Sequence, residues 1–99
     1  MASEIHFAES VTEHLRALTR TERVRVLDAV ARQLVHEPLV ETRNRKPLRP
    51  NPIAPWELRV GSLRVFYEVV LDTPDVVRVV AVGKKKRGLL RIGRREIKL

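Results

Sequence analysis

Residues 56–71 read WELRVGSLRVFYEVVL, and this stretch decides the fold. Polar and apolar residues alternate on both sides of Gly61-Ser62, as they do in β-strands that bury one face. A glycine at the first central position of a two-residue turn is typical of the turns that join antiparallel strands. The sequence therefore predicts a hairpin of two strands, residues 56–60 and 63–71.

A third strand is expected at residues 76–84, which read VVRVVAVGK. The residues before it, Asp72-Thr73-Pro74-Asp75, have the composition of a tight turn. Three strands joined by two short turns predict an antiparallel meander.

The two-residue repeat of a strand sorts the meander side chains onto two faces. One face carries Leu58, Val65 and Tyr67, and we expect it to pack against helices. The other face carries the charged residues Glu57, Arg59 and Arg64, and Lys85 if the alternation continues along the third strand. Phe66 lies outward among them, so it is the best candidate for stacking on a nucleic-acid base. The alternative is that these arginines are ordinary solvent-facing residues paired across strands with Glu57 and Glu68.

The N-terminal part predicts a strand and a helical hairpin. Residues 4–7 alternate as a short strand does, and residues 8–18 have one apolar helical face. Thr19 and Glu22 are spaced as a capping box, which starts a second helix that Glu37-Pro38 ends. The apolar face expected for this helix is Val24, Leu27, Val30, Ala31 and Leu34. The whole chain, residues 1–99, is predicted to be a single α+β domain with antiparallel helices on a largely antiparallel sheet.

Residues 37–55 contain five of the six prolines, which predicts a stiff, extended loop. Four cations lie within it: Arg43, Arg45, Lys46 and Arg49. The segment 87–99 mixes apolar and basic residues, and its pattern does not separate helix from strand.

Charge is distributed unevenly along the chain, whose net charge is +8. Residues 1–41 hold five basic and seven acidic groups, whereas residues 70–99 hold nine basic and three acidic groups. Solubility does not require such a separation, so the pattern favours a polyanionic partner on one side of the fold. The run Lys84-Lys85-Lys86-Arg87 is either part of that surface or a solvated tail.

Several classes of site have no support in the sequence. There is no cysteine, the four glycines are isolated, and the three histidines do not form a cluster with ligand spacing. We therefore expect no metal, no cofactor and no disulfide. No apolar stretch is long enough for a bilayer span, and a cytoplasmic protein without membrane contact is expected.

Four segments resemble the RelE/ParE superfamily of toxins from bacterial type II toxin–antitoxin modules. They are NRKPL at 44–48, PWELRVG at 55–61, LRVFYEV at 63–69 and AVGKKKR at 81–87. The resemblance covers nearly the whole chain and implies the RelE fold, with an N-terminal strand, two helices and the meander. It also implies a cognate antitoxin as a protein partner.

RelE-like members cleave mRNA in the ribosomal A site and leave a 2′,3′-cyclic phosphate. The resemblance then implies catalytic roles for Arg64 and Lys85 on the phosphate, for Glu57 or Lys46 in activating the 2′-hydroxyl, and for Arg91 near the leaving group. Arg91 stands where members often have Tyr or His, and arginine is a poor proton donor. Further RNA contacts are expected from Arg43, Arg45, Arg49, Arg59, Phe66, Lys84, Lys86 and Arg87.

Two other functions stay open. ParE-like members inhibit DNA gyrase and lack ribonuclease residues, and the absent Tyr or His near the chain end favours this function. A catalytically weak member that only binds RNA or an antitoxin is the third possibility.

Overall fold

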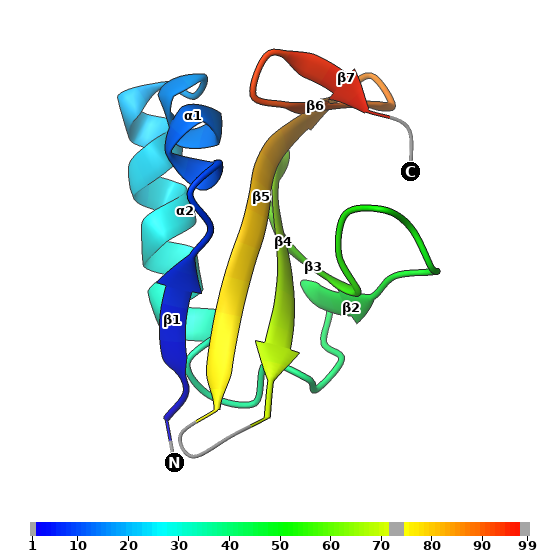
Figure 1. The fold of residues 1–99 in the computed structure, drawn as a ribbon. Helices are drawn as coiled ribbons and strands as arrows, with labels where there is room; N and C mark the ends of the chain where they lie inside the picture. The colour runs from blue at the N-terminus through cyan, green and yellow to red at the C-terminus, as the bar shows by residue number, and fades with distance from the viewer. Residues whose placement is uncertain (1, 72–74, 98–99) are drawn as a thin grey trace.

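The computed structural model describes residues 2–71 and 75–97, which form two helices and a curved sheet (Figure 1). The elements in chain order are β1 (Glu4–Phe7), α1 (Val11–Arg16), α2 (Arg20–Gln33), β2 (Arg45–Pro47), β3 (Trp56–Val60), β4 (Leu63–Val70), β5 (Val76–Lys86), β6 (Leu89–Ile92) and β7 (Arg95–Ile97). The sheet order is β2-β3-β4-β5-β6-β7, and β1 pairs in parallel with β5. Both helices lie on one side of the sheet, so the predicted α+β fold is confirmed.

The predicted meander is present as β3, β4 and β5. Gly61 has a φ of +62°, the left-handed conformation that its place in the β3–β4 turn requires. Residues 72–74 of the second predicted turn lie outside the described residues.

A β-bulge in β5 overturns the expectation of unbroken alternation. Phe66 pairs with Ala81 but the next residue, Tyr67, pairs with Val79, so Val80 is an extra residue in β5. Side chains after the bulge therefore change faces relative to those before it. Val77, Val79 and Val82 all reach the core under the helices.

Helix α2 begins as predicted but presents a different face. The Thr19 hydroxyl accepts a hydrogen bond from the Glu22 amide, and the Glu22 carboxylate accepts one from the Thr19 amide. The buried residues are Val26, Ala29, Val30 and Leu34, whereas Val24, Leu27 and Ala31 are exposed. Arg23 helps to fix this rotation, because its guanidinium donates to the carbonyl oxygen of Leu18 in the link between α1 and α2.

Both helices are shorter than predicted. Helix α1 spans only Val11–Arg16, because Phe7 belongs to β1. Helix α2 ends at Gln33, before the Glu37-Pro38 pair. The Arg45 guanidinium donates to the carbonyl oxygens of Gln33 and His36, so it satisfies acceptors that the helix end leaves free.

The proline-rich segment is partly a strand. Within it, β2 pairs with the edge of β3, and Lys46 lies opposite Glu57. Residues 48–54 form a loop in which the Asn51 side chain accepts hydrogen bonds from the amides of Ile53 and Ala54.

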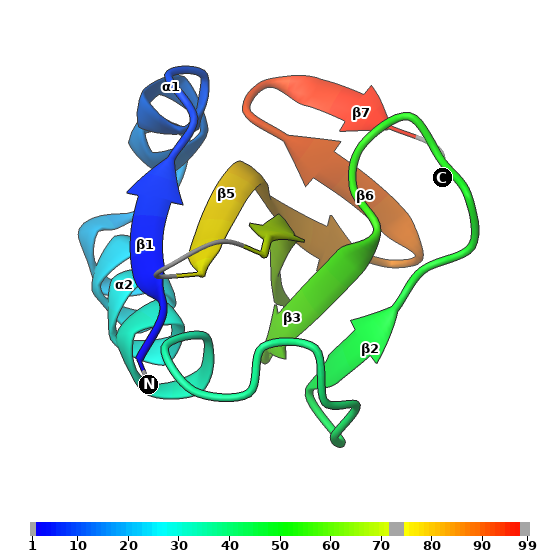
Figure 2. The same ribbon diagram turned by 60° about the horizontal axis from the view of Figure 1, so that its bottom comes forward.

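The segment that the sequence left undecided forms the β6–β7 hairpin. Its close approach to β5 depends on Gly83, because a Cβ there would lie 2.6 Å from the carbonyl oxygen of Arg91. The hairpin and the 48–54 loop both lie on the side of the sheet away from the helices (Figure 2).

Two hydrophobic cores result, one on each side of the sheet. The larger core packs the helices against Leu58, Val65 and Tyr67, as predicted. The smaller core joins the 48–54 loop and the β6–β7 hairpin to Phe66, which is 0 % exposed. The prediction that Phe66 is exposed for base stacking is therefore wrong, since the two chain segments that cover it have no strong periodic pattern in the sequence.

Candidate functional site

A charged cluster lies on the sheet face opposite the helices, centred on Glu57. One Glu57 carboxylate oxygen lies 3.4 Å from Nε of Arg59, and the other lies 3.4 Å from Nε of Arg64. The Glu57 side chain is only 7 % exposed. The carboxylate accepts a hydrogen bond from Arg59 Nε, whereas the buried Nε of Arg64 has no hydrogen-bond partner, so Glu57 holds Arg64 beside Arg59 by charge attraction alone.

The two arginines differ in accessibility. The Arg64 side chain is 12 % exposed and donates to the carbonyl oxygens of Gly61 and Leu63 at 2.7 and 2.9 Å. Burial lowers the pKa of Arg64 below its usual value. The nearby Glu57 carboxylate acts in the opposite direction and raises it. The Arg59 side chain is 40 % exposed. Arg59 can therefore meet a ligand directly, whereas Arg64 is held mainly by the protein itself.

Two further predicted residues share this face. Lys46 lies opposite Glu57 on β2, and exposed Lys85 follows Gly83, the partner of Arg64, by two residues on β5. We name Lys46, Glu57, Arg59, Arg64 and Lys85 the sheet-face cluster. Arg43 and Arg49 are exposed in the segment beside it, but Arg45 is turned toward α2.

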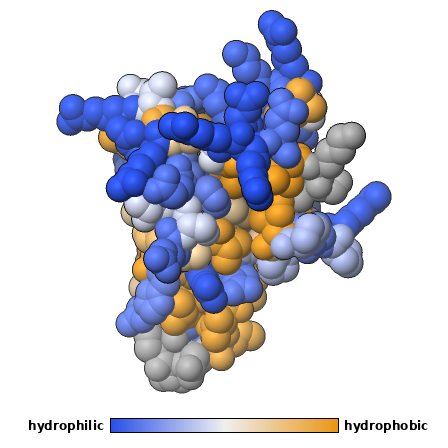
Figure 3. All heavy atoms as spheres, turned by 45° about the horizontal axis from the view of Figure 1, so that its top comes forward, coloured by the Kyte–Doolittle hydropathy of each residue, from blue (hydrophilic) through white to orange (hydrophobic). Residues whose placement is uncertain are grey.

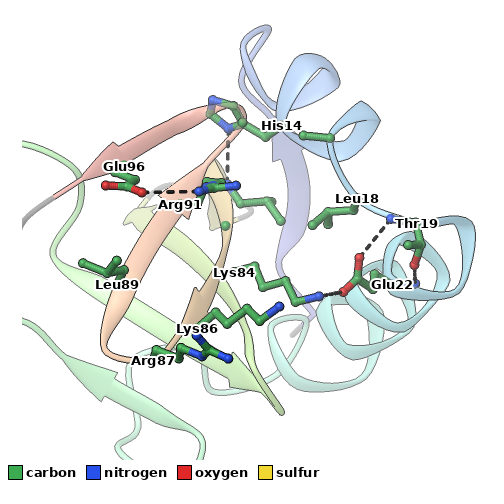
Figure 4. A pocket seen from close by; sticks show the side chains of 14 residues that line it. His14, Leu18, Thr19, Glu22, Lys84, Lys86, Arg87, Leu89, Arg91 and Glu96 are labelled. Carbon is green, nitrogen blue, oxygen red and sulfur yellow. Dashed lines mark hydrogen bonds and ion pairs between the residues drawn. The ribbon is translucent and has the colours of Figure 1, made fainter.

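A pocket of about 550 Å³ lies on the other side of β5, between the α1–α2 junction and strands β5 to β7 (Figure 4). Its charged and polar lining includes His14, Thr19, Glu22, Lys84, Lys86, Arg87, Arg91 and Glu96, and its apolar wall includes Ala17, Leu18, Val82 and Leu89. We name it the helix-side pocket. Figure 3 looks toward this end of the molecule, where long hydrophilic side chains project around apolar surface.

Ion pairs hold two of the pocket cations. Lys84 pairs with Glu22, and Arg91 pairs with Glu96 at 3.3 Å. The pKa of Glu22 is lowered mainly by the hydrogen bond from the Lys84 ammonium. The hydrogen bond from the Thr19 amide is the next largest cause. The Lys84–Glu22 pair links β5 to α2 across the pocket, whereas the Arg91–Glu96 pair lies within the β6–β7 hairpin.

His14 connects helix α1 to the strand below it. Its Nδ1 accepts a hydrogen bond from the Val82 amide at 3.3 Å, which requires the unprotonated nitrogen. Burial lowers the pKa of His14, so the neutral ring is favoured. Nothing in the sequence pattern indicates this contact, because His14 is an isolated histidine without ligand spacing.

The predicted convergence of all the basic groups on one face is wrong. Lys84 and Arg91 are paired positions on β5 and β6, and both line the helix-side pocket with Lys86. Strand alternation places Lys84 and Lys86 on the face opposite Lys85, and the unpredicted bulge at Val80 decides that Lys84 and Lys86 are the ones on the helix side. Glu22 and Thr19, seen in the sequence only as a helix cap, are pocket residues as well.

Among the described residues, no helix is long and apolar enough to cross a membrane.

Comparison with known proteins gives a family and a fold. Residues 5–89 match the family described as the ParE toxin of the type II toxin–antitoxin system parDE. No curated protein matches the chain.

Two solved structures are similar. The toxin–antitoxin complex RelBE2 from Mycobacterium tuberculosis contains a chain with a TM-score of 0.71 and 23 % identity, covering 87 % of this chain and 100 % of that one. The archaeal RelE–RelB complex from Pyrococcus horikoshii OT3 contains a chain with a TM-score of 0.67 and 20 % identity. The match covers 88 % of this chain and 99 % of that one. The chain therefore belongs to the ParE toxin family of type II toxin–antitoxin systems, within the RelE/ParE superfamily.

Proposed function

We propose that this toxin acts on messenger RNA, which it binds through the sheet-face cluster and cleaves on the ribosome. The observation that supports this is the fixed pair of arginines, Arg59 and Arg64, on the single carboxylate of Glu57. Preorganised cations on one face stabilise the negative charge of a phosphate without further reorganisation. Lys46 and Lys85 extend the same positive face on both sides.

The proposed reaction needs no cofactor. The ribose 2′-oxygen attacks the adjacent phosphorus and the bond from phosphorus to the 5′-oxygen breaks, which leaves a 2′,3′-cyclic phosphate and a 5′-hydroxyl. The proton of the 2′-hydroxyl moves to a base, and a water molecule supplies the proton that the leaving 5′-oxygen takes up. Accessible Arg59 and Lys85 would contact the phosphate oxygens, and nearly buried Arg64 and Glu57 would fix their position. Lys46, in its neutral form, would take the 2′-proton.

Expression in growing cells tests this function. Wild-type protein is expected to stop growth and to fragment messages, and the Arg59→Ala/Lys85→Ala double variant is expected to do neither at equal protein level. Arg32→Ala is the matched control, since Arg32 is an exposed arginine on α2. Intact messages in cells that express wild-type protein would reject the proposal.

A gyrase inhibitor is the second candidate. Its support is that residues 5–89 match the ParE toxin family, whose members inhibit gyrase, and that residues 87–99 contain no Tyr or His as a proton donor for the leaving oxygen. Arg91, the nearest replacement, lines the helix-side pocket and not the sheet face. Supercoiling by purified gyrase separates the two functions, because an RNA-directed toxin leaves that activity unchanged.

We further propose that a cognate antitoxin neutralises the protein, because both similar structures are toxin–antitoxin complexes. A net charge of +8 favours a partner with acidic segments. Co-purification with the product of an adjacent reading frame tests this, and a product that leaves the protein free and toxic would argue against it.

A further inference from the structure

Among the described residues, strands β1, β2 and β7 lie at free edges of the sheet. A free edge presents unpaired backbone amides and carbonyls, and proteins usually protect it against pairing with another chain. The β2 edge is protected, because the Arg45 amide donates to the Thr42 hydroxyl, the Arg45 carbonyl accepts from the Thr42 amide, and Pro47 has no amide hydrogen. The β7 edge is protected by its length of three residues and by the exposed charges of Arg95 and Glu96.

The β1 edge has neither kind of protection. Its four residues include no proline, lysine or arginine, and β5 is its one strand neighbour in the part of the chain that the structure describes (Figure 1). The Glu4 and Ala8 amides donate toward β5. Because a parallel ladder alternates, the amides and carbonyls of Ile5 and Phe7 face away from β5. These backbone groups are available to a further strand.

The residues of β1 are complementary to a second copy of the same strand. The Ser3 amide already donates to the Val35 carbonyl, so an added strand has to centre on His6. In an antiparallel pair with a two-fold axis at His6, Ile5 lies opposite Phe7 of the second copy. A β-branched residue opposite an aromatic one is a favourable cross-strand pair. This contact would cover Phe7, which is 44 % exposed in the single chain.

Charge favours a second copy over an acidic segment of another protein. Residues 1–13 contain three glutamates and no lysine or arginine, although the whole chain has a net charge of +8. An acidic strand would therefore be repelled at this edge. In the pair centred on His6, each Glu4 faces Ala8 of the second copy, and the two Glu4 residues lie roughly 13 Å apart along the seam. Each Glu4 carboxylate also lies 3.3 Å from Nε2 of its own His6.

We propose that two copies of the chain associate by antiparallel pairing of their β1 strands, so that one sheet continues through both copies. The pairing forms about four backbone hydrogen bonds around a two-fold axis. An interface this small gives a weak dimer that depends on concentration. Strand β1 lies along residues 76–79 of β5, and Lys85 lies near the other end of that strand, so the dimer leaves the sheet-face cluster uncovered. The proposal is independent of the proposed action on RNA.

Sedimentation equilibrium of the purified protein over a range of concentrations tests the association. The dimer fraction of the wild type is expected to rise with concentration. Phe7→Lys places a lysine on the edge, as protected edge strands do. It is expected to raise the Kd of the dimer about tenfold, because each dimer loses two pairs of Ile5 with Phe7. Val24→Lys is the matched control, since Val24 is an exposed apolar residue on α2, and it is expected to leave the Kd unchanged.

A single introduced cysteine tests the register of the pairing. The chain has no cysteine, so His6→Cys places one thiol on each side of the two-fold axis. The Cα atoms of such a directly opposed pair lie about 4.5 Å apart, which is within disulfide range. Mild oxidation is expected to convert most of this variant into a covalent dimer. Glu4→Cys, also at an exposed position of β1, is the control and is expected to crosslink at least tenfold more slowly, because its two thiols are separated by roughly four residues along the seam.

Three outcomes would overturn the proposal. The first is a monomer at every concentration together with no disulfide in His6→Cys. The second is a dimer that Val24→Lys abolishes and Phe7→Lys does not, which would place the interface on α2. The third is a monomeric protein in which a co-purified antitoxin protects the Ile5 and Phe7 amides from hydrogen exchange, because the edge would then bind a strand of another protein.

Discussion

The sheet-face cluster and the helix-side pocket carry similar charges but hold them in different ways. Glu57 is nearly buried and fixes two arginines on the sheet, so its charge is part of the folded structure. In the pocket, Arg91 and Glu96 are mostly exposed, and Lys86 and Arg87 are exposed without a partner in the described part of the chain. A buried network is rigid and preorganised, whereas exposed pairs exchange partners at little cost. The same residue types are therefore held rigidly on one side of the sheet and loosely on the other.

The largest expected effect comes from removing the buried carboxylate. Glu57→Gln leaves the nearly buried Arg64 guanidinium without its counter-charge, so we expect it to lower the free energy of unfolding by about 3 kcal/mol. Urea denaturation measures the loss. Glu96→Gln, which affects an exposed pair in the pocket, is the control and is expected to change stability by less than about 0.5 kcal/mol. Equal losses in the free energy of unfolding for Glu57→Gln and Glu96→Gln would show that the sheet-face cluster is held no more rigidly than the pocket pairs.

The next largest effect is expected in β5, the strand between the sheet-face cluster and the helix-side pocket. Gly83→Ala places a methyl group against the Arg91 carbonyl, where the distance would be 2.6 Å. Shifting β6 to relieve this contact is expected to cost about 2 kcal/mol. Gly88→Ala is a poor control because Gly88 has a positive φ, so Arg78→Ala, at an exposed position of β5 far from β6, serves better. Hydrogen exchange of β6 amides that stays at the wild-type rate in Gly83→Ala would contradict this account.

A smaller effect is expected at the pocket wall. Thr19→Ala removes the hydroxyl that accepts from the Glu22 amide, and we expect a loss of about 1 kcal/mol. Thr21→Ala, two residues along the same helix, is the control because it is outside the capping box. Thermal unfolding measures the Tm of both variants. Equal Tm values for Thr19→Ala and Thr21→Ala would show that the cap does not stabilise the protein.

The smallest effect is a pH dependence at His14. Burial lowers its pKa in the folded protein, so the unfolded chain takes up the proton first as pH falls below about 6.5. The contribution of His14 to the free energy of unfolding is therefore fully present well above pH 6.5, and it is lost as the pH falls below that value. His14→Gln is expected to flatten this part of the stability–pH curve, and His6→Gln is expected to leave it unchanged. A curve that His14→Gln does not alter would show that the Val82 contact has no energetic weight.

Local patterns predicted the parts of the fold that depend on neighbouring residues. The β3–β4 hairpin follows from alternation around Gly61-Ser62, and the start of α2 follows from Thr19 and Glu22. The division of the charges did not follow, because the bulge at Val80 appears only when β5 is paired with Phe66 and Tyr67. Phe66 was placed on the correct face of its strand, but the segments that bury it come from elsewhere in the chain.

The sequence predicted the sheet-face cluster about as well as it predicted the fold. Glu57, Arg59, Arg64 and Lys85 share a face as expected, since strand geometry alone orders the first three. Lys85 reaches that face because of the bulge, not through the unbroken alternation assumed from the sequence. Arg45 could not be recognised as a helix cap, because its acceptors on Gln33 and His36 are brought to it by the fold.

The most direct test of the central claim is cleavage of a defined message on programmed ribosomes by purified protein. Wild type is predicted to cut the message in the A site and to leave a 2′,3′-cyclic phosphate, while the folded Arg59→Ala/Lys85→Ala variant leaves it intact and Arg32→Ala cuts like wild type. An uncut message with wild-type protein, or equal cutting by the double variant, would contradict the assignment of RNA chemistry to the sheet-face cluster.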